Sequence, residues 1–351
     1  MTGGGNQRRV ATEDAMTDSA VSSRRGASPR RPTAGRRSPV LLTAVVLALV
    51  IVVLALVYAV GGKSHQLVTQ AIVTGVLLGG VYGLVSIGLT LIFGVLGIVN
   101  FAQGTLLTLA MYVAYLLVSS AGLDVYVATL ITIPALFLAG YVIQSTMLNR
   151  LMGAGETEGQ LLVTLGLSLL IANLLLLGFG GEPKSVSAPF EGNLHVFGAI
   201  APIPRVIAFL GALLLALGLT AILRGTRLGL SIRSVAASAH GAQLVGVNVR
   251  SIHALTFGLG TACVGAAGGL VLPFLSLTPS AGEQFTILAF VIVVLGGLGS
   301  IGGALVGGLA IGLVQTIGGL YFPGTGALLL VFGVFVLVLF FRPQGLFGSP
   351  Q

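Results

Sequence analysis

Long apolar stretches that carry almost no charge run through most of this sequence. They cover residues 40–60, 67–93, 105–121, 125–148, 161–179, 205–223, 252–275, 285–298, 302–320 and 326–341. A helix needs about 20 apolar residues to cross the hydrocarbon core of a bilayer. Charged residues make up 7% of the chain, against about 25% in a soluble domain. We therefore expect an all-α polytopic membrane protein with about ten transmembrane helices, and we exclude a soluble enzyme.

The two stretches that flank residues 296–303 are short or rich in glycine. They are compatible with two crossings or with one re-entrant unit, because irregular backbone is tolerated at membrane depth only where protein or water satisfies it. The number of full spans is accordingly eight to ten.

The positive charge of the chain is concentrated in its first 40 residues. They hold eight of the 17 basic residues and three of the nine acidic ones, and the net charge of the whole chain is +8. The rest has no basic face that could follow a phosphate backbone, so nucleic acid is excluded as a partner. We predict a disordered, Arg-rich cytoplasmic tail at 1–39 and a transmembrane domain at 40–347. The 40–60 stretch favours a retained first span over a cleaved signal peptide.

Basic residues in the loops predict the orientation in the membrane. Segment 224–250 carries Arg224, Arg227, Arg233 and Arg250 and no acidic residue, so it should be cytoplasmic. Arg342 marks the same side, whereas loop 180–204 has mixed charges and fits the outside. Both termini are then cytoplasmic.

Several chemistries are excluded by the residues that they would need. The 297–302 segment matches GxGxxG, but no acidic residue follows Glu283 to bind a ribose, so the chain has no nucleotide site of its own. Its single cysteine, Cys263, and its scattered histidines predict no disulfide, metal site or cofactor. No base stands beside a nucleophile within the spans, which disfavours an intramembrane enzyme. Because the spans also lack a carboxylate for proton coupling, we expect energy from a separate subunit, with sodium coupling left open.

Two segments interrupt the apolar pattern. In 82–104, several glycines together with Asn100 and Gln103 predict a broken helix of the kind that lines transport paths, or else a plain capped loop. In 227–248, Ser231 is expected to cap a short Ala-rich helix that ends at Gly246 in the left-handed conformation. Such a short exposed helix needs a partner to be stable, although a solvated connecting helix is the alternative.

Glycines at helical spacing predict close helix packing. Gly75, Gly79 and Gly83 lie four residues apart, and Gly303 with Gly307 and Gly308 with Gly312 repeat this spacing. Small residues at such spacing let helix backbones approach closely in lipid.

The chain resembles the branched-chain amino-acid ABC transporter permease family, of the LivH-like type. The matching stretches are 82–104, 165–168 with Asn173, 227–247, 256–269 and 294–304, and the resemblance covers about 67–347. Gln103 stands where the family usually has histidine, and residues 149–160 lack its usual Arg-Pro run.

The resemblance implies an inner-membrane permease subunit that imports branched-chain or other small neutral amino acids or amides. Its partners would be cytosolic ATPase subunits, a second permease subunit and an extracytoplasmic solute-binding protein, within the lipid bilayer. The expected translocation path is Ser86, Thr90, Asn100, Gln103, Gly104, Gly166, Ser168 and Asn173. The expected ATPase-coupling loop is Arg227, Gly229, Arg233, Ala236, Ala237, Ala242 and Gly246. The expected packing glycines are Gly75, Gly79, Gly83, Gly296, Gly297, Gly299, Gly302, Gly303 and Gly307. The alternative function is a self-contained, ion-gradient-driven carrier or channel for a small neutral solute such as urea.

Overall fold

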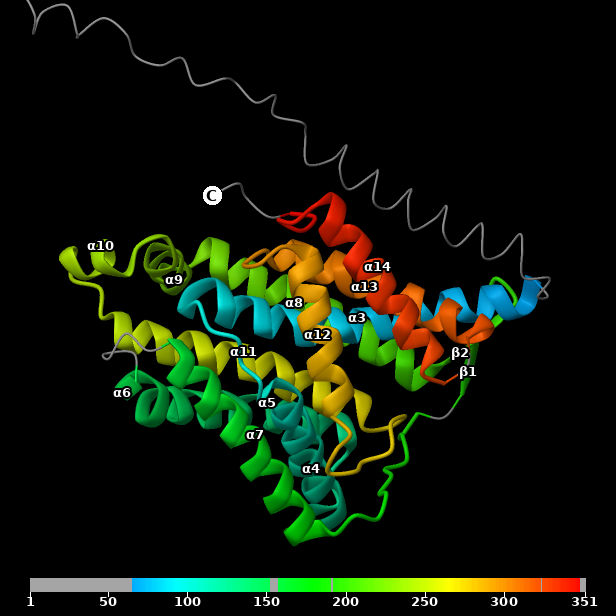
Figure 1. Cartoon of the computed structure of the whole chain (residues 1–351). Coiled ribbons are helices and arrows are strands. Elements are labelled where there is room, and N and C mark those ends of the chain that lie inside the picture. Colours follow the sequence, from blue (N-terminus) through cyan, green and yellow to red (C-terminus); the bar gives the residue numbers. More distant parts are fainter. Residues whose placement is uncertain (1–64, 152–156, 191, 323, 348–351) are drawn as a thin grey trace, which may run out of the picture. The chain divides into compact units, whose positions relative to one another are not determined.

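The structure is a computed structural model that describes residues 65–151, 157–190, 192–322 and 324–347 (Figure 1). The predictions for the tail at 1–39 and for the first span at 40–60 lie outside these residues.

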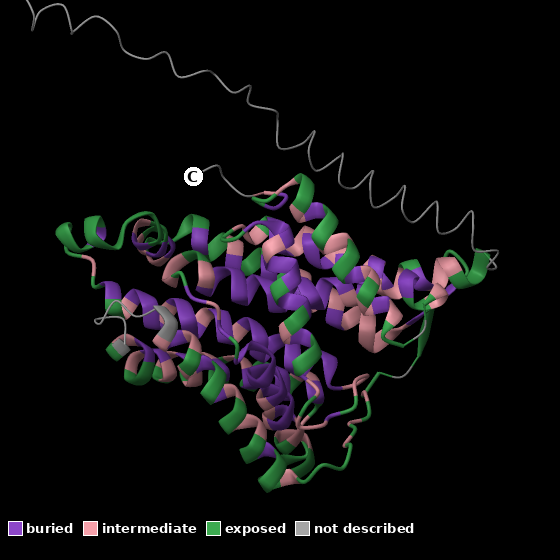
Figure 2. Cartoon of the chain, in the orientation of Figure 1, coloured by how far each residue is buried: buried purple, intermediate pink, exposed green. Residues whose placement is uncertain are grey.

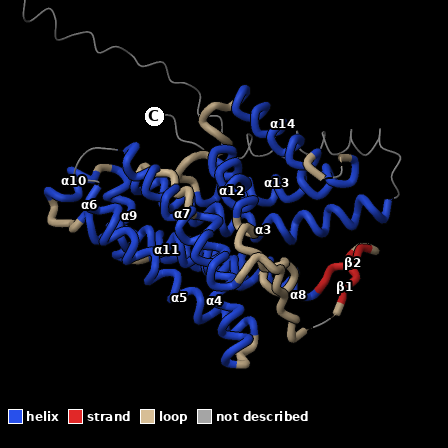
Figure 3. Tube along the Cα trace, turned by 60° about the horizontal axis from the view of Figure 1, so that its bottom comes forward, coloured by secondary structure: helices blue, strands red, loops and turns tan. Residues whose placement is uncertain are grey.

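Helices make up most of the described part of the chain, and one short hairpin supplies its strands (Figure 3). The helices are α3 (His65–Leu96), α4 (Gln103–Ala121), α5 (Val125–Ile143), the π-helix η1 (Gln144–Leu148), α6 (Asn149–Leu151), α7 (Thr157–Phe179), α8 (Ile203–Gly225), α9 (Arg227–Ala237), α10 (Ala239–Leu244), α11 (Val249–Val271), α12 (Glu283–Gly296), α13 (Ile301–Tyr321) and α14 (Gly326–Phe341). The antiparallel strands are β1 (Asn193–Val196) and β2 (Ala199–Pro202).

Seven helices of the described residues are long and apolar enough to cross a membrane, and α12 and α14 are shorter apolar helices. The expectation of an all-α polytopic membrane protein is confirmed, and the helices are consistent with about ten spans. In α12 the 14 residues span only about 21 Å at 1.5 Å per residue, less than the roughly 30 Å hydrocarbon core.

Helices α3 and α11 form the buried centre of the bundle, while α7 and α14 leave long apolar side chains exposed (Figure 2). Helix α3 packs along α13 and α11 packs along α5. Gly75, Gly79 and Gly83 lie on the α13 side of α3, and a Cβ at Gly79 would come within 2.8 Å of the Leu309 Cα. The reciprocal glycines on α13 are Gly308 and Gly312, where a Cβ would meet the α3 backbone. This crossing therefore depends on the absence of side chains on both helices.

The turn between α12 and α13 is held together by glycines. Gly297 and Gly299 have φ of +97° and +82°, in the region that favours glycine. Gly296 and Gly303 touch backbone to backbone. A Cβ added at Gly307 would lie 3.2 Å from the Ile292 carbonyl oxygen on α12. One prediction is wrong: Gly302 is exposed, and a Cβ there would meet nothing within 4 Å of it. As the second residue of α13 it points away from the packed face.

Two ends of this helical unit can be told apart by their contacts. At one end, Gln70 on α3 holds β2 through two bonds to the backbone of Ile200, of 2.7 and 2.8 Å. We call this the hairpin end. The opposite end, which we call the α9 end, joins the C-terminal part of α3, α9 and the turn at 297–300.

Candidate functional site

The predicted break between α3 and α4 is narrower than expected. Helix α3 is continuous from His65 to Leu96 and includes Gly83, Gly88 and Gly94. The break is confined to residues 97–102. The glycines do not interrupt α3; they allow contact with its neighbours, since a Cβ at Gly88 would come within 2.5 Å of the Gly260 carbonyl oxygen on α11. A continuous α3 is favoured in apolar surroundings, because a break in the helix would leave backbone N–H and C=O groups without hydrogen-bond partners.

Asn100 and Gln103 form a fully buried amide pair at this break. The Asn100 Nδ2 donates to Gln103 Oε1 over 3.1 Å, and the Asn100 Oδ1 accepts from the Ala102 N–H over 3.1 Å. The Gln103 Nε2 donates to the Val85 carbonyl, also over 3.1 Å. Val85 lies about three turns before the end of α3, so the 97–102 segment runs back along α3. Helix α4 therefore begins inside the bundle, with its first polar groups satisfied by side chains.

The starts of α4 and α12 meet through reciprocal hydrogen bonds. The Gly104 N–H donates to Thr286 Oγ1 over 2.9 Å, and the Gly282 N–H donates to Thr108 Oγ1 over 2.9 Å. Gly104 and Gly282 touch backbone to backbone, so neither position has room for a Cβ. The sequence interpretation included Gly104 but missed Thr108, Gly282 and Thr286. Their signal was a shared Gly-x-x-x-Thr pattern at 104–108 and 282–286.

The remaining predicted path residues are spread over different faces. Ser168 on α7 lies beside this region, since its hydroxyl and that of Thr105 are 2.5 Å apart. Gly166 and Asn173 are exposed on α7, and the Asn173 side chain donates to the Leu169 carbonyl of its own helix. Ser86 donates to the Tyr82 carbonyl, also within its helix. The structure thus brings Asn100, Gln103, Gly104 and Ser168 into one region, without Gly166 or Asn173.

Thr90 lies in a separate cavity at the α9 end. The cavity has a volume of about 570 Å³ and is lined by residues of α3, α8, α9, the 299–302 segment and Phe347. Its walls include Arg224 and Arg233. The segment after α14 reaches it because the N–H groups of Leu346 and Phe347 donate to the carbonyls of Leu295 and Gly296, over 2.8 and 3.1 Å.

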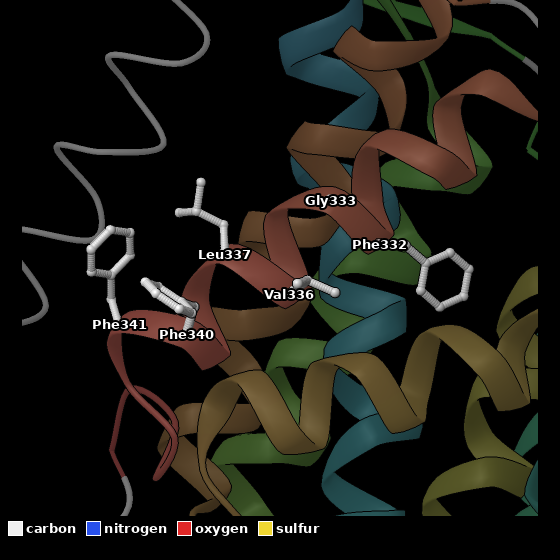
Figure 4. A pocket seen from close by; sticks show the side chains of 6 residues that line it. All are labelled: Phe332, Gly333, Val336, Leu337, Phe340 and Phe341. Atoms are coloured by element: carbon white, nitrogen blue, oxygen red, sulfur yellow. The ribbon is translucent and has the colours of Figure 1, made fainter.

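Another hollow of about 550 Å³ is formed by α14 alone, from Phe332 to Phe341. Figure 4 shows its apolar side chains projecting from that single helix, so this feature is a groove on an exposed apolar face rather than an enclosed site.

The predicted coupling segment is two short helices rather than one. Helix α9 is capped by Thr226, whose hydroxyl accepts from the Gly229 N–H over 3.1 Å, and α10 is capped in the same way by Ser238. The expected cap at Ser231 is wrong, because Ser231 lies within α9 and donates to the Arg227 carbonyl. Thr226 precedes the first turn and therefore competes better for its free N–H groups. Gly246 has the predicted left-handed conformation, with φ of +85°.

One face of α9 and α10 packs on the bundle, and the other is bare. Gly229 and Ala242 are buried, and Arg233 donates to the Leu223 carbonyl at the end of α8. Ala236 and Ala237 are exposed. Leu230, Leu244 and Val245 are also exposed, at 61%, 76% and 78%. This leaves an acid-free surface between two spans, on which small and aliphatic side chains lie among exposed polar and basic ones such as Arg227 and Gln243.

The carboxylates of the described spans lie at helix ends. Asp124 caps α5 by accepting from the Tyr126 N–H over 2.8 Å, and Glu283 is exposed at the start of α12. The four histidines lie on separate elements, and among the described residues no three His, Cys, Asp or Glu side chains gather as metal ligands.

Comparison with known proteins agrees with this arrangement. Residues 71–339 match the family model described as branched-chain amino acid transport system / permease component. The chain is 31% identical to the high-affinity branched-chain amino acid transport system permease protein BraD of Pseudomonas aeruginosa, over 80% of this chain and 96% of that protein. It is 28% identical to the LivH permease of Salmonella typhimurium and 29% identical to that of Escherichia coli K12, each over 80% of this chain and 96% of the relative. No solved structure gives a significant match.

The family model covers well over half of the chain, and it matches a bundle whose helices break at a buried polar site. The chain belongs to the branched-chain amino acid transport system permease family and is a multi-pass membrane permease.

Proposed function

We propose that this chain is the membrane-spanning subunit of an ATP-driven importer for branched-chain or other small neutral amino acids or amides. The bare surface of α9 and α10 carries the proposal. Two capped helices of 11 and six residues lie between spans and expose leucine and valine on a side free of acidic residues. Short helices in water are marginal without tertiary contacts, and exposed apolar patches mark interaction sites.

The partner of this surface would be a cytosolic ATPase subunit. Arg227, Gly229, Arg233, Ala236, Ala237, Ala242 and Gly246 would then form the coupling loop within 224–250. Small side chains at Ala236 and Ala237 suit close seating in a groove. The anchoring of α9 on α8 would carry ATP-driven motion from the loop into the spans.

The path for the solute would pass the amide pair and the crossing of α4 with α12. Asn100, Gln103, Gly104 and Ser168 supply neutral donors and acceptors there, within an otherwise apolar bundle. Ser86, Gly166 and Asn173 remain candidates for other parts of the route, with Gly166 and Asn173 on the exposed α7 face that a second permease subunit would cover, whereas Thr90 lies apart from it in the cavity at the α9 end. Because none of these path residues is a carboxylate, they offer no group for a proton relay and no anionic ligand for a coupling cation.

The orientation follows from the basic loops. With the α9 end in the cytoplasm, both termini and the tail at 1–39 lie inside, and the hairpin end faces an extracytoplasmic solute-binding protein. The membrane would be a bacterial-type plasma membrane. The partner permease is a second copy or a sister chain, and no cofactor is required by this chain.

A crosslinking experiment tests the partner directly. An Ala237→Cys variant in a Cys263→Ala background carries one exposed thiol, which a short bifunctional reagent should join to a co-expressed ATPase subunit of the same transport system. The matched control is Ser119→Cys. Ser119 is exposed in the last turn of α4, outside the coupling loop, and this variant should give no such product. Equal crosslinking from both sites would reject α9 as the docking helix.

The alternative is a self-contained carrier or channel for a small neutral solute. Sodium bound by backbone carbonyls at the 97–102 break would be its coupling ion. Uptake by the purified chain driven by an ion gradient alone is the result that favours it.

A further inference from the structure

The cavity at the α9 end has the features of an anion-binding site. Among the described residues, the charged side chains that line it are those of Arg224 and Arg233, both positive. They come from α8 and α9, and the second arginine is held in place by its bond to the Leu223 carbonyl. No carboxylate of the described residues lines the cavity, so none of these residues neutralises the two guanidinium groups.

The start of α13 adds a third source of positive potential. Ser300, Ile301 and Gly302 line the cavity, and α13 begins at Ile301. The Ser300 hydroxyl accepts from the Gly303 N–H, whereas the first N–H groups of an α-helix have no acceptor within the helix. Gly302 leaves open space beside its backbone, since a Cβ there meets nothing within 4 Å. The helix dipole favours negative charge at this position.

Thr90 is an independent sign of a ligand. Its side chain is fully buried and lines the cavity, yet among the described residues its hydroxyl has no hydrogen-bond partner. Buried helical threonines elsewhere, such as Thr129 and Thr132, donate to the carbonyl four residues earlier. A buried hydroxyl without a partner costs free energy that a bound acceptor would recover.

The outer surface of α8 indicates what kind of anion reaches the cavity. Leu210, Leu214 and Leu217 are 56%, 72% and 61% exposed. They follow the helical spacing of four and three residues that leads to Arg224 at the mouth of the cavity. An exposed apolar stripe that ends at a basic cavity matches an acyl chain joined to a negative head group.

We propose that this cavity binds the phosphate of an anionic phospholipid, with the head group between Arg224, Arg233 and the start of α13, and one acyl chain along α8. The inference goes beyond the transport function; with the orientation proposed above, it places the lipid in the cytoplasmic leaflet. A free amino acid fits less well, because its ammonium group would find no carboxylate among the described residues that line the cavity.

The test compares lipids on the purified full-length chain. Thermal unfolding is measured in nanodiscs of phosphatidylcholine with and without added phosphatidylglycerol, and retained lipid is counted by native mass spectrometry. We expect phosphatidylglycerol to raise the unfolding temperature and to remain bound. Arg224→Gln and Arg233→Gln should each weaken retention roughly five-fold. Arg250→Gln, in the same loop but outside the cavity lining, should leave retention unchanged.

Thr90→Val tests the site without altering α9, because Thr90 lies on α3. It removes only the unpartnered hydroxyl, so it should preserve stability in phosphatidylcholine and reduce the phosphatidylglycerol effect. Equal retention by Arg224→Gln and Arg250→Gln would overturn the proposal. So would equal stabilisation of detergent-solubilised protein by inorganic phosphate, which would make the ligand a free anion, or by leucine, which would make the cavity a solute site. None of these outcomes depends on whether the chain transports a solute.

Discussion

A methyl group added at Gly88 should loosen the centre of the bundle. In Gly88→Ala the new Cβ would lie 2.5 Å from the Gly260 carbonyl oxygen and 3.0 Å from the Gln103 Nε2. Helices α3 and α11 must therefore separate, and the bond from Gln103 to the Val85 carbonyl is displaced. Overpacking costs about 1–3 kcal/mol and a lost hydrogen bond about 1 kcal/mol, while the gain in helix propensity offsets about 1 kcal/mol. The net loss is about 1–3 kcal/mol.

The chain supplies its own probe for this measurement. Cys263 is its single cysteine and is buried on α11, so a thiol-reactive fluorogenic dye reports unfolding. At roughly 2–4 °C per kcal/mol, Gly88→Ala should lower the midpoint by several degrees. The control is Gly166→Ala, the same change within α7, where a Cβ meets nothing within 4 Å. It should leave the midpoint unchanged or raise it, and equal shifts in both variants would refute the close approach of α3 and α11.

Three further changes test the site, the coupling segment and the packing. Gln103→Leu removes the two side-chain bonds of Gln103, to Asn100 and to the Val85 carbonyl, and should slow solute uptake at least roughly ten-fold, since one lost hydrogen bond to a buried partner already has about that effect. Gln103→His, which keeps a donor, should retain most uptake, and equal loss in both would tell against a polar role. Ala237→Glu adds a charge to the exposed face of α9 and should abolish ATP-driven uptake while membrane insertion, measured by fractionation, stays normal; undiminished uptake would remove α9 from coupling. Thr316→Val deletes the 2.9 Å bond from α13 to the Ala71 carbonyl and should cost about 0.6 kcal/mol, a small drop in the dye-measured midpoint, whereas a drop as large as that of Gly88→Ala would contradict this estimate.

Much of the fold could be predicted because lipid leaves a chain few options. Runs of apolar residues had to become helices, since backbone groups find no partner in hydrocarbon. Gly75, Gly79 and Gly83 identified one face of α3 from spacing alone, although their partners on α13 depended on tertiary contacts. The buried amide pair was likewise visible as two polar residues in an apolar stretch.

Other features depended on choices that local sequence does not encode. Ser231 and Thr226 are both good caps, and only the end of α8 decides which of them begins α9. Gly302 is next to the packed Gly303 in the sequence, yet it lies on the exposed side of α13. The crossing of Gly104 with Gly282 joins residues far apart in the sequence, so a short Gly-x-x-x-Thr pattern became meaningful only once α4 and α12 met.

Solute uptake into proteoliposomes tests the central claim most directly. The purified chain is reconstituted alone, and in parallel with the ATPase subunits, any sister permease and the solute-binding protein of its transport system. Labelled leucine and labelled urea are supplied with ATP or with an ion gradient. We predict no uptake by the chain alone under either driving force, and ATP-dependent uptake of a small neutral solute by the full assembly. Uptake by the chain alone, driven by an ion gradient, would contradict the claim that a partner supplies the energy.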